Sequence, residues 1–239
     1  MAEGRLVVRR LLRETSFSVR SLLVTEAALR GLRDVLEAGV AASIPIYVAD
    51  VERMRAVTGF NFHRGCLALA ERPRERSLDA VVRAAPSPQR FVILERVGNA
   101  DNVGAVFRNA AAFDAAVLLG PGCCDPLYRK AIRVSMGASL TTPWTRVDPW
   151  PDRLQELRAR AMRLIALTPR RDADDIAAVA DRALRDNVGL LLGCEGEGLS
   201  SEVTALADVR ARIPMKSGLD SLNVATAAAI ALYRLCEPR

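Results

Sequence analysis

The sequence lacks any run of about 18 apolar residues, so it predicts no membrane-spanning helix. Its first residues include arginines but no apolar stretch followed by a cleavage site, so we expect no secretory signal. The five cysteines lack metal-ligand spacing, and Cys123 and Cys124 are too close together to form a zinc pair. Reduced thiols are the simplest interpretation, and we expect a cytoplasmic protein without a bound metal.

Histidine, lysine and aromatic residues are also scarce. The single histidine, His63, has no carboxylate nearby in the sequence, which is more typical of a local hydrogen-bonding role than of catalysis. Aromatic residues make up 5% of the chain, so stacking of many splayed bases is not favoured. The net charge is +6, and among the cationic residues only Lys130 and Lys216 are not arginines. Arginine suits bidentate phosphate contacts and a polyanionic partner, although a GC-rich coding bias would give the same skew.

The first 76 residues alternate between short apolar segments and helical patterns, which predicts a small α/β domain. We expect strands at 21–25, 44–49 and 66–70 and helices at 26–38 and 50–57. Residues 1–20 contain five arginines and allow two interpretations, a basic arm that contacts phosphates or an amphipathic helix. If they form a helix, its expected packing residues are Leu6, Val7, Leu11 and Leu12.

The same alternation continues beyond residue 91 with longer apolar runs, which predicts a mostly parallel α/β sheet of five or six strands. Expected strands are 91–95, 115–119, 163–167, 188–192 and 209–213. Expected helices lie near 102–113, 126–132, 152–161, 174–184, 200–206 and 221–235. A charged stretch and the run Ala84-Ala85-Pro86-Ser87-Pro88 mark a boundary. We therefore predict a domain at 1–76, a linker at 77–90 and a domain at 91–239.

Polar residues gather where these buried strands end, at the edge where an open parallel sheet binds ligands. Asp101 or Asn102 is the expected cap of the helix that carries Arg108, and Arg108 alone could equally be an exposed surface residue. Glycines at 193, 196 and 198 follow an apolar strand. Their order, G-x-x-G-x-G with two acidic residues inside, disfavours a dinucleotide loop because the carboxylates would repel a pyrophosphate.

Three segments together resemble the SpoU family of the SPOUT superfamily of RNA methyltransferases. They are N-x-G-x-x-x-R at 102–108, G-x-E-G-x-G at 193–198, and I-P-M at 213–215 followed by S-L-N-V at 221–224. The resemblance implies an α/β fold whose C-terminal segment forms a deep trefoil knot. Residues 1–76 similarly resemble the ribosomal-protein-like RNA-binding domain that often precedes this fold. Departures from the family pattern are Asn109 for a threonine, Asp114 for a glycine, and Ala225-Thr226 for Ser-Val.

The resemblance implies transfer of a methyl group from S-adenosylmethionine to a ribose 2′-hydroxyl of tRNA or rRNA, by a homodimer with its site at the dimer interface. It places five residues around the methyl group and the acceptor ribose: Asn102, Arg108, Glu195, Ser221 and Asn223. It assigns the cofactor to Leu192, Gly193, Gly198, Ile213, Met215 and Leu222, with Thr168 as a further candidate. Because a guanidinium stays protonated, we expect Arg108 to bind the adjacent phosphate or the developing alkoxide rather than act as a base.

Two other functions fit parts of the sequence. A non-catalytic RNA-binding protein on the same scaffold would share the fold and the charge, but the intact candidate residues argue against it. A nicotinamide oxidoreductase would bind its dinucleotide at the glycine loop, but the order of the glycines in this loop argues against that function.

Overall fold

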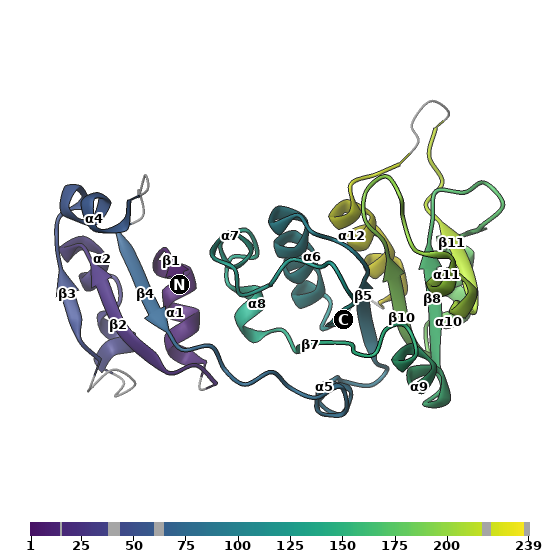
Figure 1. Ribbon diagram of the computed structural model, residues 1–239, viewed down its shortest axis with the longest axis horizontal. Helices are drawn as coiled ribbons and strands as arrows, with labels where there is room; N and C mark the ends of the chain where they lie inside the picture. Colours follow the sequence, from purple (N-terminus) through teal and green to yellow (C-terminus); the bar gives the residue numbers. More distant parts are fainter. Residues whose placement is uncertain (15, 38–43, 60–64, 217–220, 237–239) are drawn as a thin grey trace. The chain divides into compact units, whose positions relative to one another are not determined.

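The computed structural model describes residues 1–14, 16–37, 44–59, 65–216 and 221–236 (Figure 1). The chain forms two compact units. The first combines Met1–Arg74 with Pro126–Thr141, and the second combines Glu75–Asp125 with Thr142–Arg239. The sequence assigned 126–141 to the second domain, whereas these residues pack with the first unit.

The first unit is a four-stranded sheet covered by helices. The strand order is β1–β4–β2–β3, antiparallel except for the parallel pair β2 and β3. The strands are β1 (Ala2–Glu3), β2 (Val19–Val24), β3 (Ile46–Val48) and β4 (Cys66–Ala70). The helices are α1 (Arg5–Arg13), α2 (Glu26–Arg30), α3 (Arg33–Val35), α4 (Val51–Thr58), α7 (Arg129–Val134) and α8 (Ala138–Thr141). All three strands expected here are present, and the two-residue β1 is an addition.

The N-terminal arginines lie on a helix, so the amphipathic interpretation of residues 1–20 is the one the structure shows. Helix α1 buries Val7, Val8, Leu11 and Leu12. The expectation for Leu6 was wrong, because its side chain is 46% exposed and Val8 occupies the buried face instead. The single helix predicted at 26–38 is also wrong, since α2 ends at its C-cap Gly31 and α3 begins after it.

Residues 126–141 join the first unit through apolar packing and one ion pair. Ile132 and Leu140 lie in the same core cluster as the buried face of α1. Arg129 Nη1 lies 2.9 Å from Glu3 Oε2, and the Glu3 residue is only 5% exposed. A helical pattern indicates which face of a helix is buried but not which core it packs into. The sequence therefore did not reveal that residues 126–141 pack in the first unit.

The second unit is a seven-stranded sheet in which every named strand pair is parallel, which confirms the predicted mostly parallel α/β architecture. The strand order is β7–β6–β5–β10–β8–β11–β9. The strands are β5 (Arg90–Leu94), β6 (Ala116–Leu119), β7 (Trp144–Arg146), β8 (Met162–Leu167), β9 (Asp174–Asp175), β10 (Asn187–Leu192) and β11 (Val209–Arg212). The prediction of five or six strands was too low, because the edge strands β7 and β9 are short and have no apolar run.

Helices cover both faces of this sheet and give three layers (Figure 1). On one face lie α6 (Ala100–Ala112), α10 (Ile176–Ala183) and α12 (Val224–Leu235). On the other lie α5 (Leu78–Ala84), α9 (Arg153–Ala159) and α11 (Ser201–Leu206). Because both faces are buried, the strands are continuous apolar runs, and the polar residues at their carboxyl ends remain available for a site.

One helix cap differs from the sequence prediction. Asn99, rather than Asp101 or Asn102, caps α6 by accepting a hydrogen bond from the Asp101 amide at 2.8 Å. This difference leaves the Asn102 side chain free of capping. Asn223 caps α12 by accepting hydrogen bonds from the amides of Ala225 and Thr226.

Two departures from the family pattern have a local explanation. Asp114 follows α6 with a φ of 51°, the left-handed region in which glycine is favoured. Asn109 on α6 donates from Nδ2 to the Ala225 carbonyl at 2.7 Å. This bond ties α6 to the first turn of α12, the two helices that carry Asn102 and Asn223.

A buried arginine holds the ends of two helices. Arg90, at the start of β5, is 5% exposed. It donates to the carbonyls of Leu184 at 2.6 Å and of Leu235 at 2.9 Å, which lie at the ends of α10 and α12, and also to the Asp186 carbonyl. These carbonyls have no partner within their helices, so the guanidinium satisfies them.

Replacing Arg90 with methionine is expected to lower the free energy of unfolding by about 2–4 kcal/mol, because several buried carbonyls lose their donor. Urea denaturation followed by circular dichroism measures this. The control is Arg182→Met, since the exposed Arg182 side chain pairs with Asp174 at 2.9 Å and should contribute less than about 1 kcal/mol. Equal stability losses in the two variants would contradict the role given to Arg90.

Candidate functional site

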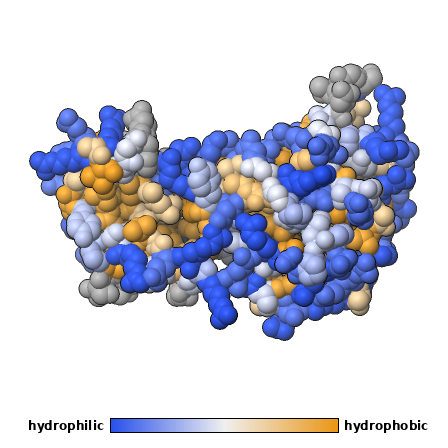
Figure 2. Space-filling model, viewed as in Figure 1, coloured by the Kyte–Doolittle hydropathy of each residue, from blue (hydrophilic) through white to orange (hydrophobic). Residues whose placement is uncertain are grey.

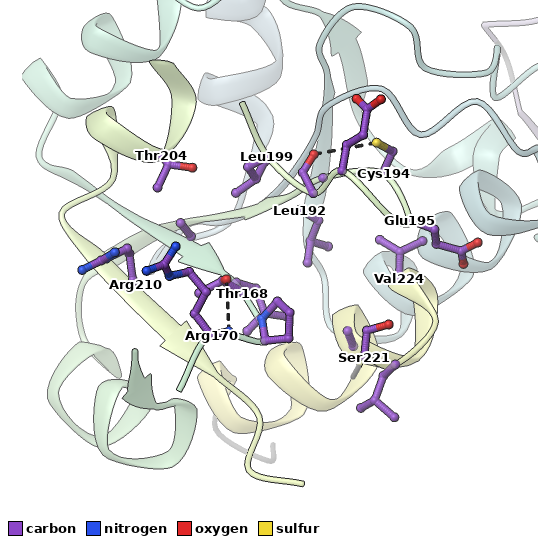
Figure 3. Close-up of a pocket in the computed structure, with 18 of the residues that line it drawn as sticks. Thr168, Arg170, Leu192, Cys194, Glu195, Leu199, Thr204, Arg210, Ser221 and Val224 are labelled. Atoms are coloured by element: carbon purple, nitrogen blue, oxygen red, sulfur yellow. Dashed lines mark hydrogen bonds between the residues drawn. The ribbon is translucent and has the colours of Figure 1, made fainter. Parts of the chain in front are cut away.

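A cavity of about 1010 Å³ opens at the carboxyl ends of β8, β10 and β11 (Figure 3). Its walls come from the ends of these strands and the segments after them, from α11 and from the start of α12. Every residue expected to bind the cofactor lines it, namely Thr168, Leu192, Gly193, Gly198, Ile213, Met215 and Leu222. Glu195 and Ser221, two of the residues expected around the methyl group, also line it.

The loop after β10 folds back tightly on itself. The Gly198 amide donates to the Cys194 carbonyl at 3.0 Å, and the two residues form an isolated antiparallel bridge. A Cβ atom on Gly193 would lie 2.1 Å from the Gly198 carbonyl carbon, closer than any real contact. Gly196 and Gly198 have φ values of 88° and 72°. Glycine at 193 is therefore required by close backbone approach, and glycine at 196 and 198 by backbone conformation.

The three motifs meet in one hydrogen-bonded cluster. Glu195 Oε1 accepts from Asn102 Nδ2 at 3.1 Å and from Asn223 Nδ2 at 2.8 Å. Asn223 Nδ2 also donates to Asn102 Oδ1 at 2.8 Å. Within the described residues Glu195 has no ion-pair partner, so no protein cation offsets its carboxylate beside the cavity. The cluster can therefore attract a cation or accept a hydrogen bond from a hydroxyl group.

Two residues at the end of β5 hold the glycine loop, and sequence reasoning missed both. Glu95 is 3% exposed and accepts hydrogen bonds from Trp150 Nε1 at 3.0 Å and from the amide and hydroxyl of Ser200 at 2.7 and 2.8 Å. Arg96, with a φ of 57°, pairs with Glu197 at 3.2 Å and donates to the Gly198 carbonyl at 3.4 Å. The sequence signal that could have identified them is the presence of two adjacent charged residues directly after an apolar strand.

Replacing Glu95 with glutamine is expected to weaken cofactor binding about tenfold, because its amide group cannot accept all three hydrogen bonds and the loop loses an anchor. Isothermal titration with S-adenosylmethionine measures the change. Glu75→Gln is the matched control, since Glu75 Oε1 accepts from the Arg146 amide at 2.7 Å outside the cavity. Wild-type cofactor affinity in both variants, together with equal losses of stability, would contradict the anchoring role given to Glu95.

Arg108 is the predicted site residue that stands apart. It lies on α6 with an exposed side chain and is not among the residues that line the cavity. Among the described residues it has no hydrogen bond or ion pair. Asn102 lies on the same helix, and α6 packs against α12. His63 lies outside the described residues.

The cysteines are all free thiols. Burial raises the pKa of the Cys66 thiol to about 12 and also raises the pKa of Cys123, so both stay protonated. In the described ranges, no three His, Cys, Asp or Glu side chains come together to hold a metal. No helix in that part of the chain is long and apolar enough to cross a membrane.

Comparison with known proteins accounts for the cluster of the three motifs. Residues 89–233 match the SpoU rRNA Methylase family, more than half of the chain. The chain belongs to this family. The resemblance predicted from the motifs is thus confirmed, and the predicted cofactor, S-adenosylmethionine, is the one this family uses.

Similar proteins include sequence relatives and a solved structure, all named as methyltransferases. An uncharacterized tRNA/rRNA methyltransferase of Mycobacterium bovis is 44% identical over 98% of this chain and 79% of its own length. The 23S rRNA (guanosine-2′-O-)-methyltransferase RlmB of Ralstonia nicotianae is 28% identical over 88% of this chain and 84% of its own. The SpoU methyltransferase AviRb of Streptomyces viridochromogenes, solved with AdoMet, has a TM-score of 0.81 at 22% identity, covering 98% and 88% of the two chains. The two sequence relatives support an RNA methyltransferase, and the AviRb structure shows the same fold.

Proposed function

We propose that the protein transfers a methyl group from S-adenosylmethionine to a ribose 2′-hydroxyl in tRNA or rRNA. The observation that carries the proposal is the cluster in which Asn102 and Asn223 both donate to the Glu195 carboxylate beside the cavity. The 2′-O specificity is supported by the name of the Ralstonia relative.

The cavity fits the cofactor in shape and charge. Leu192, Ile213 and Leu222 supply apolar walls for the adenine, and the bare backbone at Gly193 allows close approach of the ribose. Met215, Gly198 and Thr168 also line the cavity and are assigned to the cofactor site. The Glu195 carboxylate, which has no ion-pair partner in the described part of the chain, complements the positive charge of a sulfonium, and the cofactor supplies the electrophilic methyl group.

The chain's own residues then act on the acceptor. A 2′-hydroxyl is a poor nucleophile unless its proton leaves as the new bond forms. We assign Arg108 to the neighbouring phosphate or the developing alkoxide, with the proton passing to water. Ser221 and Asn223 position the ribose, and Asn102 and Asn223 hold Glu195 in place.

We further propose that the protein is a cytoplasmic homodimer with a C-terminal trefoil knot, as the SPOUT resemblance implies. Tyr233 on α12 is 62% exposed, and the neighbouring helix α6 carries the exposed Arg108. Exposed aromatic residues and arginines are enriched at interfaces, and these two lie on helices that pack against each other.

The first unit is assigned to RNA binding. Its edge strand β3 exposes Ile46, Tyr47 and Val48, with 36%, 59% and 49% of their surfaces accessible. Figure 2 shows apolar surface over the strands of this unit. A tyrosine at such a position can stack on an unpaired base, which suits recognition of single-stranded RNA.

Two measurements test the proposed function. Isothermal titration should detect S-adenosylmethionine binding, and tritium from the labelled cofactor should pass to unmodified tRNA or rRNA transcripts. Binding of RNA without transfer would favour a non-catalytic RNA-binding protein, and binding of NAD in the same titration would favour an oxidoreductase. Mapping the 2′-O-methyl groups lost on deletion of the gene would then identify the target nucleotide.

A further inference from the structure

Two arginines at one end of the cavity have no role in the chemistry described so far. Arg170 follows β8 and Arg210 lies on β11, and both line the cavity. Figure 3 shows them at one end, with Glu195 and Ser221 at the other. Their side chains are 67% and 46% exposed, so a large ligand can reach them from solvent.

One carboxylate serves both guanidinium groups. Asp172 accepts from Arg170 at 3.0 Å and 3.3 Å, in a two-point contact. Its second oxygen lies 3.5 Å from Arg210 Nη1, beyond a good hydrogen bond. The hydrogen bonds from Arg170 hold the pKa of the Asp172 carboxyl below its usual range, so the group stays charged. Two positive charges therefore face one negative charge.

Two neighbouring aspartates are engaged elsewhere. Asp174 pairs with Arg182 at 2.9 Å, and Asp175 caps α10 by accepting from the Ala177 amide at 2.8 Å. In the described part of the chain, Asp172 is thus the carboxylate that pairs with both guanidinium groups, and it holds Arg210 less closely than Arg170.

We propose that Arg170 and Arg210 bind a backbone phosphate of the RNA strand whose ribose enters the cavity. The proposal rests on the proposed function, because that function makes RNA the substrate. Asp172 orients the Arg170 guanidinium toward the phosphate, and Arg210, which Asp172 holds less closely, makes the second contact to it. A phosphate offers two oxygens to a guanidinium, which makes arginine the suitable residue at an exposed site.

The carboxylate of S-adenosylmethionine is the competing anion. It is joined to the sulfonium through only three carbons, so it stays near the Glu195 end, where the sulfonium is assigned. The volume of about 1010 Å³ is also at the upper limit of what one small ligand fills, roughly 300–1,000 Å³. Space therefore remains at the arginine end for part of a second molecule.

The test compares RNA and cofactor binding in four variants. The probe is a fluorescein-labelled, mixed-sequence single-stranded RNA, and fluorescence anisotropy is recorded over a series of potassium chloride concentrations. Arg210→Gln should weaken RNA binding about tenfold at low salt and make the slope of log K against log salt shallower by about 0.7, the value for one lost phosphate contact. Arg170→Gln should change binding in the same direction.

Asp172→Asn should have the opposite effect and strengthen RNA binding, because it removes the competing carboxylate while keeping the shape. Arg182→Gln removes the same charge from an exposed arginine that does not line the cavity, and it should leave RNA binding unchanged. Titrations with S-adenosylmethionine should give the wild-type affinity in all four variants.

Three outcomes would overturn the phosphate site. Arg210→Gln could bind RNA like wild type, it could lose cofactor rather than RNA affinity, or Asp172→Asn could weaken RNA binding as much as Arg210→Gln does. The proposed function fails separately, if wild-type protein transfers no methyl group to any RNA. In that case a loss of RNA binding in Arg210→Gln would still support the phosphate site.

Discussion

Gly193→Ala is expected to abolish cofactor binding, with the affinity for S-adenosylmethionine falling at least about a hundredfold. The added Cβ would lie 2.1 Å from the Gly198 carbonyl carbon and 2.3 Å from the Leu199 nitrogen, and both are backbone atoms. Backbone cannot rotate away as a flexible side chain can, so the loop must open. Isothermal titration measures the affinity, and tritium transfer should fall with it.

Two other glycine variants provide a graded control for this prediction. A Cβ on Gly98 would meet only the Gly122 carbonyl at 3.6 Å, an ordinary contact, so Gly98→Ala should bind normally. A Cβ on Gly196 would have no atom within 4 Å, but Gly196→Ala places alanine at a φ of 88°, which should cost about 1–2 kcal/mol of strain. Wild-type affinity in Gly193→Ala, or an equal loss in all three variants, would contradict the close-approach explanation.

The buried strands were predictable from sequence because a parallel sheet covered on both faces demands continuous apolar runs. The runs ending at Leu94 and at Leu192 met that demand, and both are central strands of the sheet. The edge strands β7 and β9 were not predictable. Each has two or three residues, and β9 consists of two aspartates without an apolar side chain to mark them as a strand.

The helix caps were harder to predict than the helices. The segment Asn99-Ala100-Asp101-Asn102 offers three good capping residues within four positions, and local propensity cannot choose among them. Tertiary contacts exclude Asn102, because its side chain is bound to Glu195 and Asn223, and of the two remaining residues Asn99 is the cap. The motifs therefore identified the site residues, while the bonds between them required the fold.

The glycine loop illustrates the same limit. Its glycines were recognisable, but Glu95 and Arg96, which hold it, lie about a hundred residues earlier in the chain. Parallel pairing of β5 with β10 brings the two segments together. Sequence pattern alone does not give strand order, so this support could not be derived from the residues.

Arg108→Gln is expected to lower the rate of methyl transfer by about 10²–10³ while leaving the affinity for S-adenosylmethionine unchanged. The reason is that an electrostatic contact to the reacting oxygen or its phosphate acts in the transition state, and its removal typically costs this much. Arg108→Lys keeps the charge but loses the fork, so it should also be slower than wild type. Single-turnover transfer to RNA measures the rate. A full rate in the lysine variant would contradict the assignment.

The position of Arg108 makes a second, sharper test possible. It is exposed and does not line the cavity of its own chain, so in the proposed homodimer it would act on the cavity of the partner subunit. A heterodimer of Arg108→Gln with Gly193→Ala, purified through two different tags, would then contain one complete site. It should recover about half of the wild-type activity, although each homodimer is inactive. If Arg108 acts within its own subunit, neither site of the heterodimer is complete, and mixing should restore nothing.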